Sequence, residues 1–202
     1  VRSVDYVRGC VFIDIGGGTS DISVWQVSNQ GMLYQTSLRF AGRDIFLEIL
    51  RRNPSFLKRL GDSSDNSKLT DEDIARLHQV SKDNTIFYTQ ADAILADNGE
   101  KWLKYLPIIS GNDVVQGFIS LIALGLGALF YYIGLVLRYL YESDKYTERL
   151  PDVFIAGNGS NLLHWLGHGN FNSNTPVNDL FKDMLTEAAG FEPETFNIIM
   201  SE

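Results

Sequence analysis

The chain has 202 residues, of which 45% are apolar and 21% are charged, and this composition excludes a disordered, collagen-like or coiled-coil protein. Its formal net charge of −8 argues against nucleic acid and anionic membranes as partners, because both attract basic surfaces. The single cysteine, Cys10, excludes an internal disulfide framework and fits a reducing compartment, so we expect a cytoplasmic protein.

The N-terminal part of the chain predicts three strands joined by short turns. Residues 10–15 form a short apolar run that is typical of a buried strand, and residues 22–27 begin a second strand with partial alternation. Residues 28–31 read Ser-Asn-Gln-Gly, which is typical of a turn, and residues 32–40 predict a third strand. We therefore expect an antiparallel three-strand meander whose first turn is rich in glycine.

Residues 43–52 place their apolar side chains on one face of a predicted helix. The following stretch, 61–104, differs in character, with nine acidic residues against five basic ones. Within it, Thr70 precedes three carboxylates, which predicts a capped helix N-terminus. We expect 61–104 to be a small, mostly helical subdomain inserted into a main domain made of residues 1–60 and 105–202.

Residues 117–137 contain no charged side chain over 21 positions. That length is enough for a transmembrane helix. The alternatives are one buried core helix or two helices broken near residues 125–127. We favour the core, since a span here would place the glycine segments before and after it on opposite sides of a membrane, and a membrane is therefore not an expected partner.

The C-terminal part predicts strands that alternate with helices. Residues 152–156 and 195–200 read as short apolar strands. Residues 176–189 predict an amphipathic helix that ends at Gly190. The order β-β-β-α, insert, α-β-α-β predicts an α/β protein with a mixed sheet, antiparallel in the meander and parallel beyond it, covered by helices on both faces.

The strongest functional signal is Asp-Ile-Gly-Gly-Gly-Thr-Ser-Asp at residues 14–21. Gly16, Gly17 and Gly18 allow the backbone to approach a ligand closely and to adopt positive φ. Successive N–H groups can then converge on phosphate oxygens. These glycines therefore predict a phosphate-binding loop.

Two side chains flank this loop. Asp14 lies at the end of the predicted buried strand, where burying a carboxylate costs free energy unless it has a partner or a function. Beside phosphates, its function would be to hold Mg²⁺ directly or through water. The Thr19 hydroxyl is placed to hydrogen-bond a terminal phosphate. The alternative is a tight hairpin that needs glycine and carries a solvated aspartate.

The second signal is Val-Phe-Ile-Ala-Gly-Asn-Gly-Ser at residues 153–160. A strand runs into a Gly-x-Gly turn at Gly157, Asn158 and Gly159, and Ser160 opens a helix, which is an arrangement that suits a nucleotide. Alone it is a weak signal, because glycine is common in such connections. Its weight comes from its pairing with the first loop.

Together these residues resemble the actin-like ATPase superfamily, which includes actin, DnaK-type heat-shock chaperones, bacterial actin-like proteins and sugar kinases. Residues 14–24 resemble its second phosphate motif, residues 40–45 resemble the helix start that follows, and residues 153–160 resemble its adenosine motif. The residues of these motifs are closer to those of the chaperone and bacterial-actin branch than to those of sugar kinases. The resemblance implies a ribonuclease-H-like fold for the main domain, with 61–104 as the smaller subdomain of the second lobe.

The resemblance also implies ATP and Mg²⁺ as ligands. Asp14 would organise Mg²⁺ and the attacking water, and Thr19 would act with it in catalysis. The phosphates and the adenosine would be contacted by Gly16, Gly17, Gly18, Thr19, Gly157, Asn158, Gly159 and Ser160. Asn158 departs from the family pattern, since most relatives have glycine there.

The family's first phosphate loop and connecting helices do not occur in this sequence. We therefore expect the second lobe of a longer ATPase, with the missing first lobe as its partner. A cleft that excludes water and aligns the γ-phosphate needs both walls, so the chain alone should bind nucleotide weakly and not hydrolyse it. The alternatives are a lobe of a sugar or acid kinase or of a polyphosphate phosphatase, and a degenerate actin-like scaffold or interaction module that self-associates.

Overall fold

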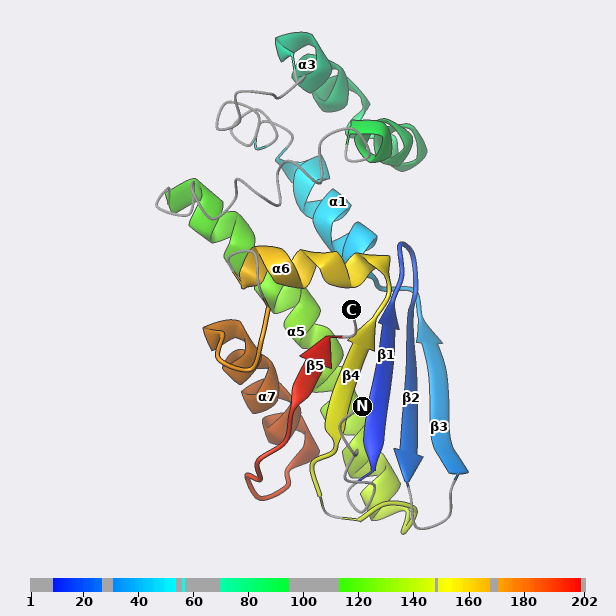
Figure 1. The fold of residues 1–202 in the computed structure, drawn as a ribbon. Coiled ribbons are helices and arrows are strands. Elements are labelled where there is room, and N and C mark those ends of the chain that lie inside the picture. Colours follow the sequence, from blue (N-terminus) through cyan, green and yellow to red (C-terminus); the bar gives the residue numbers. More distant parts are fainter. Residues whose placement is uncertain are drawn as a thin grey trace. The chain divides into compact units, whose positions relative to one another are not determined.

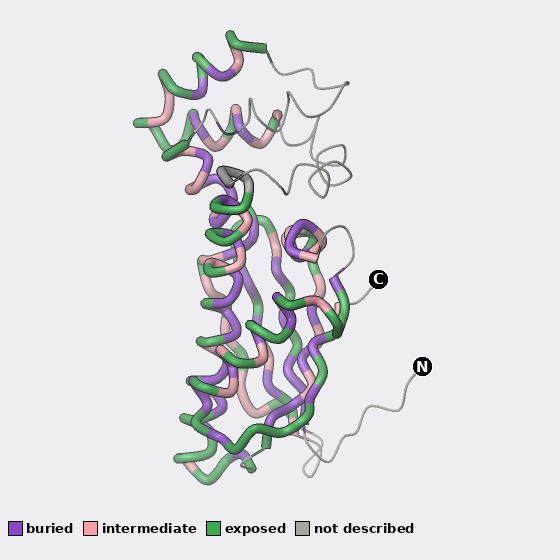
Figure 2. The backbone as a smooth tube through the Cα atoms, turned by 90° about the vertical axis from the view of Figure 1, so that its left-hand side faces the viewer, coloured by how far each residue is buried: buried purple, intermediate pink, exposed green. Residues whose placement is uncertain are grey.

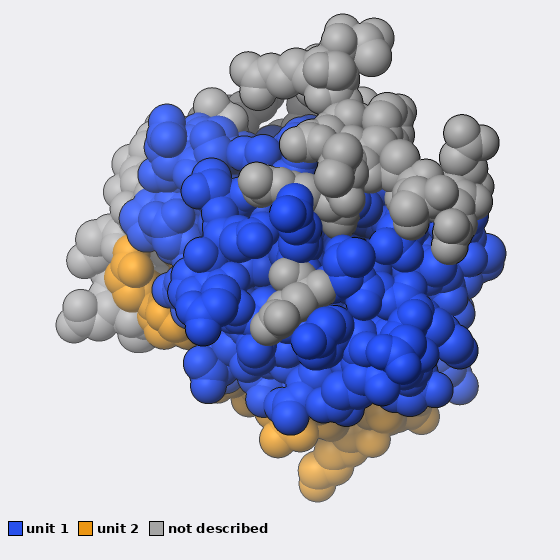
Figure 3. All heavy atoms as spheres, turned by 90° about the horizontal axis from the view of Figure 1, so that it is seen from below, with its two compact units in different colours: residues 1–43, 123–202 blue, residues 44–122 orange. Residues whose placement is uncertain are grey.

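The computed structural model describes residues 9–26, 31–53, 56, 70–94, 113–147, 149–167 and 171–200. It divides into two compact units, of which the first comprises residues 1–43 and 123–202 and the second residues 44–122 (Figure 3). The predicted boundaries at residues 60 and 105 lie outside the described residues and stay a prediction.

The elements follow the predicted order of strands and helices (Figure 1). The strands are β1 (Cys10–Ile15), β2 (Ser20–Gln26), β3 (Gly31–Leu38), β4 (Asp152–Ala156) and β5 (Ile198–Met200). The helices are α1 (Gly42–Arg52), α3 (Asp71–Val80), α5 (Asp113–Glu142), α6 (Leu162–Leu166) and α7 (Pro176–Ala189), and the 3₁₀ helix η2 (Asn158–Asn161) precedes α6.

The five strands form one mixed sheet in the order β3-β2-β1-β4-β5. β1 pairs antiparallel with β2, and β2 pairs antiparallel with β3. β4 runs parallel to both β1 and β5. The predicted α/β class, with an antiparallel meander continued by parallel strands and flanked by helices, is therefore confirmed, and this strand pattern is consistent with a ribonuclease-H-like fold.

Side chains alternate between the two faces of this sheet, because successive residues of a strand point to opposite sides. On one face, apolar residues of β1, β2, β4 and β5 are buried together with α5 and α7; they include Val11, Ile13, Ile15, Ile22, Val24, Val153, Ile155 and Ile198. The predicted cover on both faces is not what the described residues show. On the other face Phe12 stacks on Phe154 with ring centroids 5.1 Å apart, and Phe12 is 45% exposed.

Helix α5 is continuous through the glycines at 125 and 127, so of the two alternatives it is one helix and not two helices broken there. One side of it packs on α7, where Phe130 stacks on Phe181 at a centroid distance of 4.4 Å. By length and composition alone, the stretch Gln116–Glu142 could cross a membrane, yet 44% of its most apolar window is buried inside the structure. A buried face of this kind is what a core helix has.

Between residues 70 and 94 the second unit is helical over 71–80 and 84–94, with a turn at 81–83. Thr70 caps α3 as predicted: its hydroxyl accepts the Asp73 N–H at 3.2 Å, while the Asp73 carboxylate accepts the Thr70 N–H at 3.0 Å. This reciprocal pair is a capping box, which satisfies two donors at the helix start. The predicted polar loop over residues 61–67 lies outside the described residues.

An ion-pair cluster on the second unit gives a prediction about pH. Glu48 accepts two hydrogen bonds from Arg51, at 2.7 and 2.9 Å, and one from Arg52 at 3.0 Å, and these contacts lower the pKa of Glu48 to about 2. Since the folded pKa lies below the unfolded value, the cluster stabilises the fold above about pH 4.5, and the effect is lost as the pH falls towards 2.

We expect Glu48→Gln to lower the free energy of unfolding by about 1 kcal/mol or less at neutral pH, because water screens this half-exposed cluster. Urea denaturation of both proteins at several pH values from neutral to acid checks it, and the difference should shrink as the pH falls below about 4.5. A difference of the same size at every pH would contradict the role given to the carboxylate.

Candidate phosphate-binding site

Three glycine segments far apart in the sequence meet at the carboxyl ends of β1 and β4 (Figure 1). A methyl group placed on Gly159 would strike the Gly16 carbonyl oxygen and would lie 2.8 Å from that of Ile15. One placed on Gly42, at the start of α1, would lie 2.7 Å from the Gly159 carbonyl oxygen. Glycine at positions 42 and 159 therefore lets these backbones touch, and it brings the two predicted loops together.

Three short hydrogen bonds hold these segments. The Gly16 N–H donates to the Thr19 carbonyl at 2.8 Å and closes the β1–β2 hairpin. The buried Ser20 hydroxyl donates to the Phe40 carbonyl at 2.6 Å and ties this hairpin to the chain entering α1. The Ser160 hydroxyl donates to the Gly157 carbonyl at 2.6 Å and closes the turn after β4.

Gly17 and Gly18 stand at the exposed tip of the hairpin, and packing does not explain them. An added methyl group would meet nothing within 4 Å at Gly18 and only the Arg43 side chain, at 3.9 Å, at Gly17. The predicted positive φ is wrong for this loop, because the described glycines with positive φ are Gly9, Gly157 and Gly190. These two glycines therefore leave open space beside the backbone, which a ligand could fill.

Asp14 is exposed, which corrects the prediction that its carboxylate sits in a buried strand. Because β1 alternates, Ile13 and Ile15 face the helices and Asp14 faces the open side of the sheet. Its Oδ1 lies against Gly157, where φ is +90° and a methyl group would strike it. A residue other than glycine at 157 would therefore be doubly strained.

Asp21 is a residue that the sequence reasoning missed. In the β1–β2 register it lies directly opposite Asp14, and both are exposed. Like charges in this position destabilise a sheet, so the pair has a cost that a bound cation would remove. Mg²⁺ is usually held by one or two carboxylates together with phosphate and water oxygens, so the two aspartates fit it. The hairpin spacing was the signal: with the turn at 16–19, residues 14 and 21 must pair.

Arg43 was also missed as a site residue. It is exposed at the second position of α1, and its Cδ would lie 3.9 Å from a methyl group added at Gly17. A guanidinium at that place, beside the first turn of a helix, suits a phosphate group both by charge and by hydrogen-bond geometry. Only the folded chain shows this, because the two positions lie far apart in sequence.

The second loop differs from its predicted form in detail. Asn158 is exposed and begins η2, so it does not need the left-handed conformation that asparagine tolerates. Ser160 is buried and its hydroxyl is engaged with the Gly157 carbonyl, which makes it a brace of the loop. Contacts of Gly157, Asn158, Gly159 and Ser160 with a ligand stay predictions.

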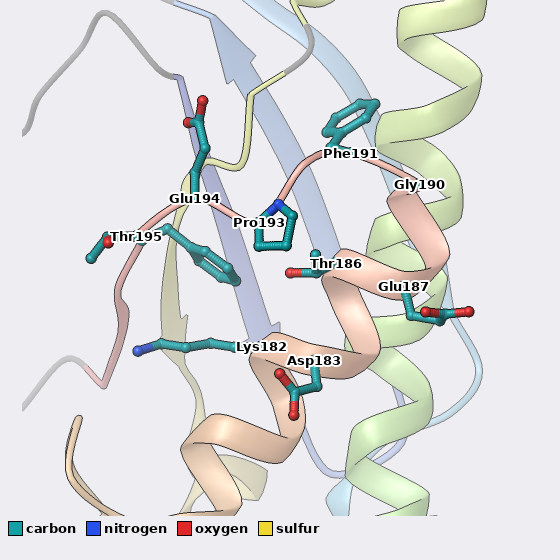
Figure 4. Close-up of a pocket in the computed structure, with 10 residues that line it drawn as sticks. Lys182, Asp183, Thr186, Glu187, Gly190, Phe191, Pro193, Glu194 and Thr195 are labelled. Atoms are coloured by element: carbon teal, nitrogen blue, oxygen red, sulfur yellow. The ribbon is translucent and has the colours of Figure 1, made fainter.

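A cavity of about 730 Å³ lies elsewhere, between α7 and the segment that leads into β5 (Figure 4). Its charged lining consists of Lys182 against Asp183, Glu187 and Glu194, and this excess of carboxylates does not suit a phosphate. Within the described part of the chain, no three His, Cys, Asp or Glu side chains come together as a metal centre. Neither finding bears on a site made of backbone and two carboxylates.

The described fold and site define an α/β protein whose glycine loops meet at the carboxyl ends of two neighbouring strands. No protein-family model matches the chain, and no curated protein matches it in sequence. Among solved structures it is similar to the ethanolamine utilization protein EutJ from Carboxydothermus hydrogenoformans, with 12% identity and a TM-score of 0.36. The alignment covers 96% of this chain and 44% of that one, so the chain spans less than half of that protein's length. A likeness at this level adds no argument about function.

Proposed function

We propose that the carboxyl ends of β1 and β4 bind the phosphates of Mg-ATP, and that the chain is the second lobe of an actin-like or chaperone-like ATPase. One observation carries the proposal. The fold needs glycine at 42, 157 and 159 to bring the loops together, but it does not need glycine at 17 and 18. Glycine there keeps the backbone of the hairpin tip accessible, which is what phosphate oxygens require.

Each residue then has a role that its position supports. The hairpin tip at Gly17 and Gly18 offers backbone to the phosphates, and the exposed Thr19 hydroxyl can donate to a terminal oxygen. Asp14 and Asp21 accept from metal-bound water or ligate Mg²⁺, and Arg43 faces the charge on the phosphates. Mg²⁺, when bound, neutralises phosphate charge. Gly157, Asn158 and Gly159 line the side of the site where the nucleoside would lie.

ATP hydrolysis would take place in the longer protein that has both lobes, where Asp14 would orient the attacking water. A single lobe leaves the phosphates open to solvent, so this chain should bind nucleotide without turning it over. The alternative phosphotransferases on the same fold would share the phosphate loops and differ in the missing lobe.

The Mg²⁺ dependence of ATP affinity tests the proposal. We expect Asp14→Asn and Asp21→Asn each to weaken Mg-ATP binding about tenfold, and to leave ATP binding in EDTA unchanged or slightly tighter. Isothermal titration calorimetry with and without Mg²⁺ measures both. Asp179→Asn, an exposed aspartate on α7, is the matched control and should change neither value.

Stability without ligand provides the second readout. Removing one of two opposed carboxylates relieves repulsion, so Asp21→Asn should keep or slightly raise the free energy of unfolding. A folded Asp14→Asn protein that binds Mg-ATP as well as the native chain would contradict the role of Asp14. Binding that weakens equally in all three variants would show a general charge effect and would also contradict the proposal.

A further inference from the structure

Helix α5 carries an exposed apolar stripe on the side that does not face α7 or the sheet. Leu124 is 62% exposed, Tyr131 43% and Leu135 44%, and Ala128 between them is exposed as well. These exposed positions recur along the helix (Figure 2). Contiguous apolar surface of this kind marks an interaction site.

The spacing of the stripe indicates what covers it. Leu124, Ala128, Tyr131 and Leu135 follow one another at intervals of four, three and four residues, and Arg138 continues the series. This is the 3-4 repeat by which two helices pack along a shared seam. Over residues 124–142 the helix rises about 27 Å, which is long enough for several layers of contact.

The residues in the stripe are complementary to themselves when a second copy runs in the opposite direction. In the register that sets Leu124 against Leu135 of the other copy, Ala128 lies against its Tyr131, a small side chain against a large one. The same register is satisfied twice across a two-fold axis, as a symmetric dimer requires.

The charge at the end of the stripe argues against the parallel alternative. Arg138 pairs with Glu142 on the same helix, Nε to Oε1 at 2.9 Å, and both side chains are more than half exposed. A parallel pair would bring Arg138 against Arg138 of the second copy. The antiparallel register keeps the two Arg138 side chains apart, because it places each of them beside Leu121 of the other copy, which is 50% exposed.

We propose that this stripe is the interface of an antiparallel dimer with a second copy of the chain. The inference is independent of nucleotide binding, because it uses no residue of the glycine loops. A lipid surface is the less suited occupant: the buried half of α5 is committed to α7 and the sheet, and the chain's net charge of −8 repels anionic headgroups.

A charge-pair experiment tests both the partner and the direction. Sedimentation equilibrium over a range of concentrations should give a dimer for the native chain. Leu124→Lys alone and Leu135→Glu alone should each raise the dimer dissociation constant at least about tenfold. The double variant should recover dimerisation, because the introduced lysine of one copy faces the introduced glutamate of the other only in the antiparallel register.

Leu180→Lys is the matched control, since Leu180 on α7 is 42% exposed and lies off the stripe, and it should dimerise as the native chain does. Circular dichroism and thermal melting verify that each variant is folded. A native chain that is monomeric at all concentrations overturns the proposal, and so does a double variant that stays as dissociated as the single ones. Binding of the monomer to phosphatidylcholine vesicles that Leu124→Lys abolishes would assign the stripe to lipid instead.

Discussion

Gly159→Ala is expected to lower the free energy of unfolding by about 3 kcal/mol, which is among the largest effects of a one-carbon change. The added methyl group would strike the Gly16 carbonyl and would lie 2.8 Å from the Ile15 carbonyl oxygen. Both obstacles are backbone at the end of a central strand, so neither can move aside as a flexible side chain can. Urea denaturation followed by circular dichroism measures the effect.

Gly18→Ala is the control for this prediction. It adds the same group to the partner loop, where nothing lies within 4 Å and φ is not positive. The free energy of unfolding should stay within about 1 kcal/mol of the native value, with a small gain from the reduced freedom of the unfolded chain. Equal losses at 18 and 159 would mean that the loops do not meet as described.

Gly134→Ala should have a comparable effect, about 3 kcal/mol, for a different reason. Gly134 lies where α5 touches α7, and a methyl group there would strike the Leu185 carbonyl and come within 2.6 Å of the Ala188 Cβ. Two backbones are in contact at this point, and α5 and α7 would have to separate to admit the methyl group. The helix pair would then lose packing around Phe130 and Phe181.

Gly117→Ala is the matched control on the same helix. Gly117 is exposed and an added methyl group meets nothing within 4 Å, so alanine should raise the free energy of unfolding by up to about 1 kcal/mol through helix propensity. A Gly134→Ala protein as stable as the native chain would show that α5 does not pack on α7 at this contact.

The sequence predicted those elements best that are short and apolar or clearly capped. The strands at 10–15 and 152–156 and the helix at 176–189 have the predicted bounds. The last of these begins with Pro176 and ends at Gly190, which adopts the left-handed conformation, φ +67°, typical of a helix end. Such local signals do not depend on the rest of the fold.

Features that depend on register or on tertiary contacts were harder to predict. A shift of one residue in the strand register exchanges the two faces of the sheet and so decides whether Asp14 faces the core or solvent. A run of apolar residues such as 10–15 does not specify which face is buried. Glycines 125 and 127 left open whether residues 117–137 form one helix or two, and the structure has one helix in which Gly127 lies against Met184 and Phe181. The loop contacts of Gly42 with Gly159 join positions that no periodicity connects.

The glycine motifs illustrate the same division. Sequence reasoning identified both loops and expected them to serve one ligand, and the fold places them side by side. The sequence alone does not distinguish the glycines that the fold requires, at 42, 157 and 159, from the glycines at 17 and 18, which the fold does not require. The atoms that surround each Cα in the structure make this distinction, and it identifies Gly17 and Gly18 as the positions to test for ligand binding.

Nucleotide binding at the glycine loops is tested most directly by titrating Mg-ATP into the isotope-labelled chain and following the backbone amide resonances. We expect shifts confined to residues 14–21, 42–43 and 157–160, with Gly17 and Gly18 among the largest. Inorganic pyrophosphate should shift the hairpin residues without those of the second loop. An absence of shifts at saturating nucleotide, or shifts only around the cavity at Lys182 and Glu194, would contradict it.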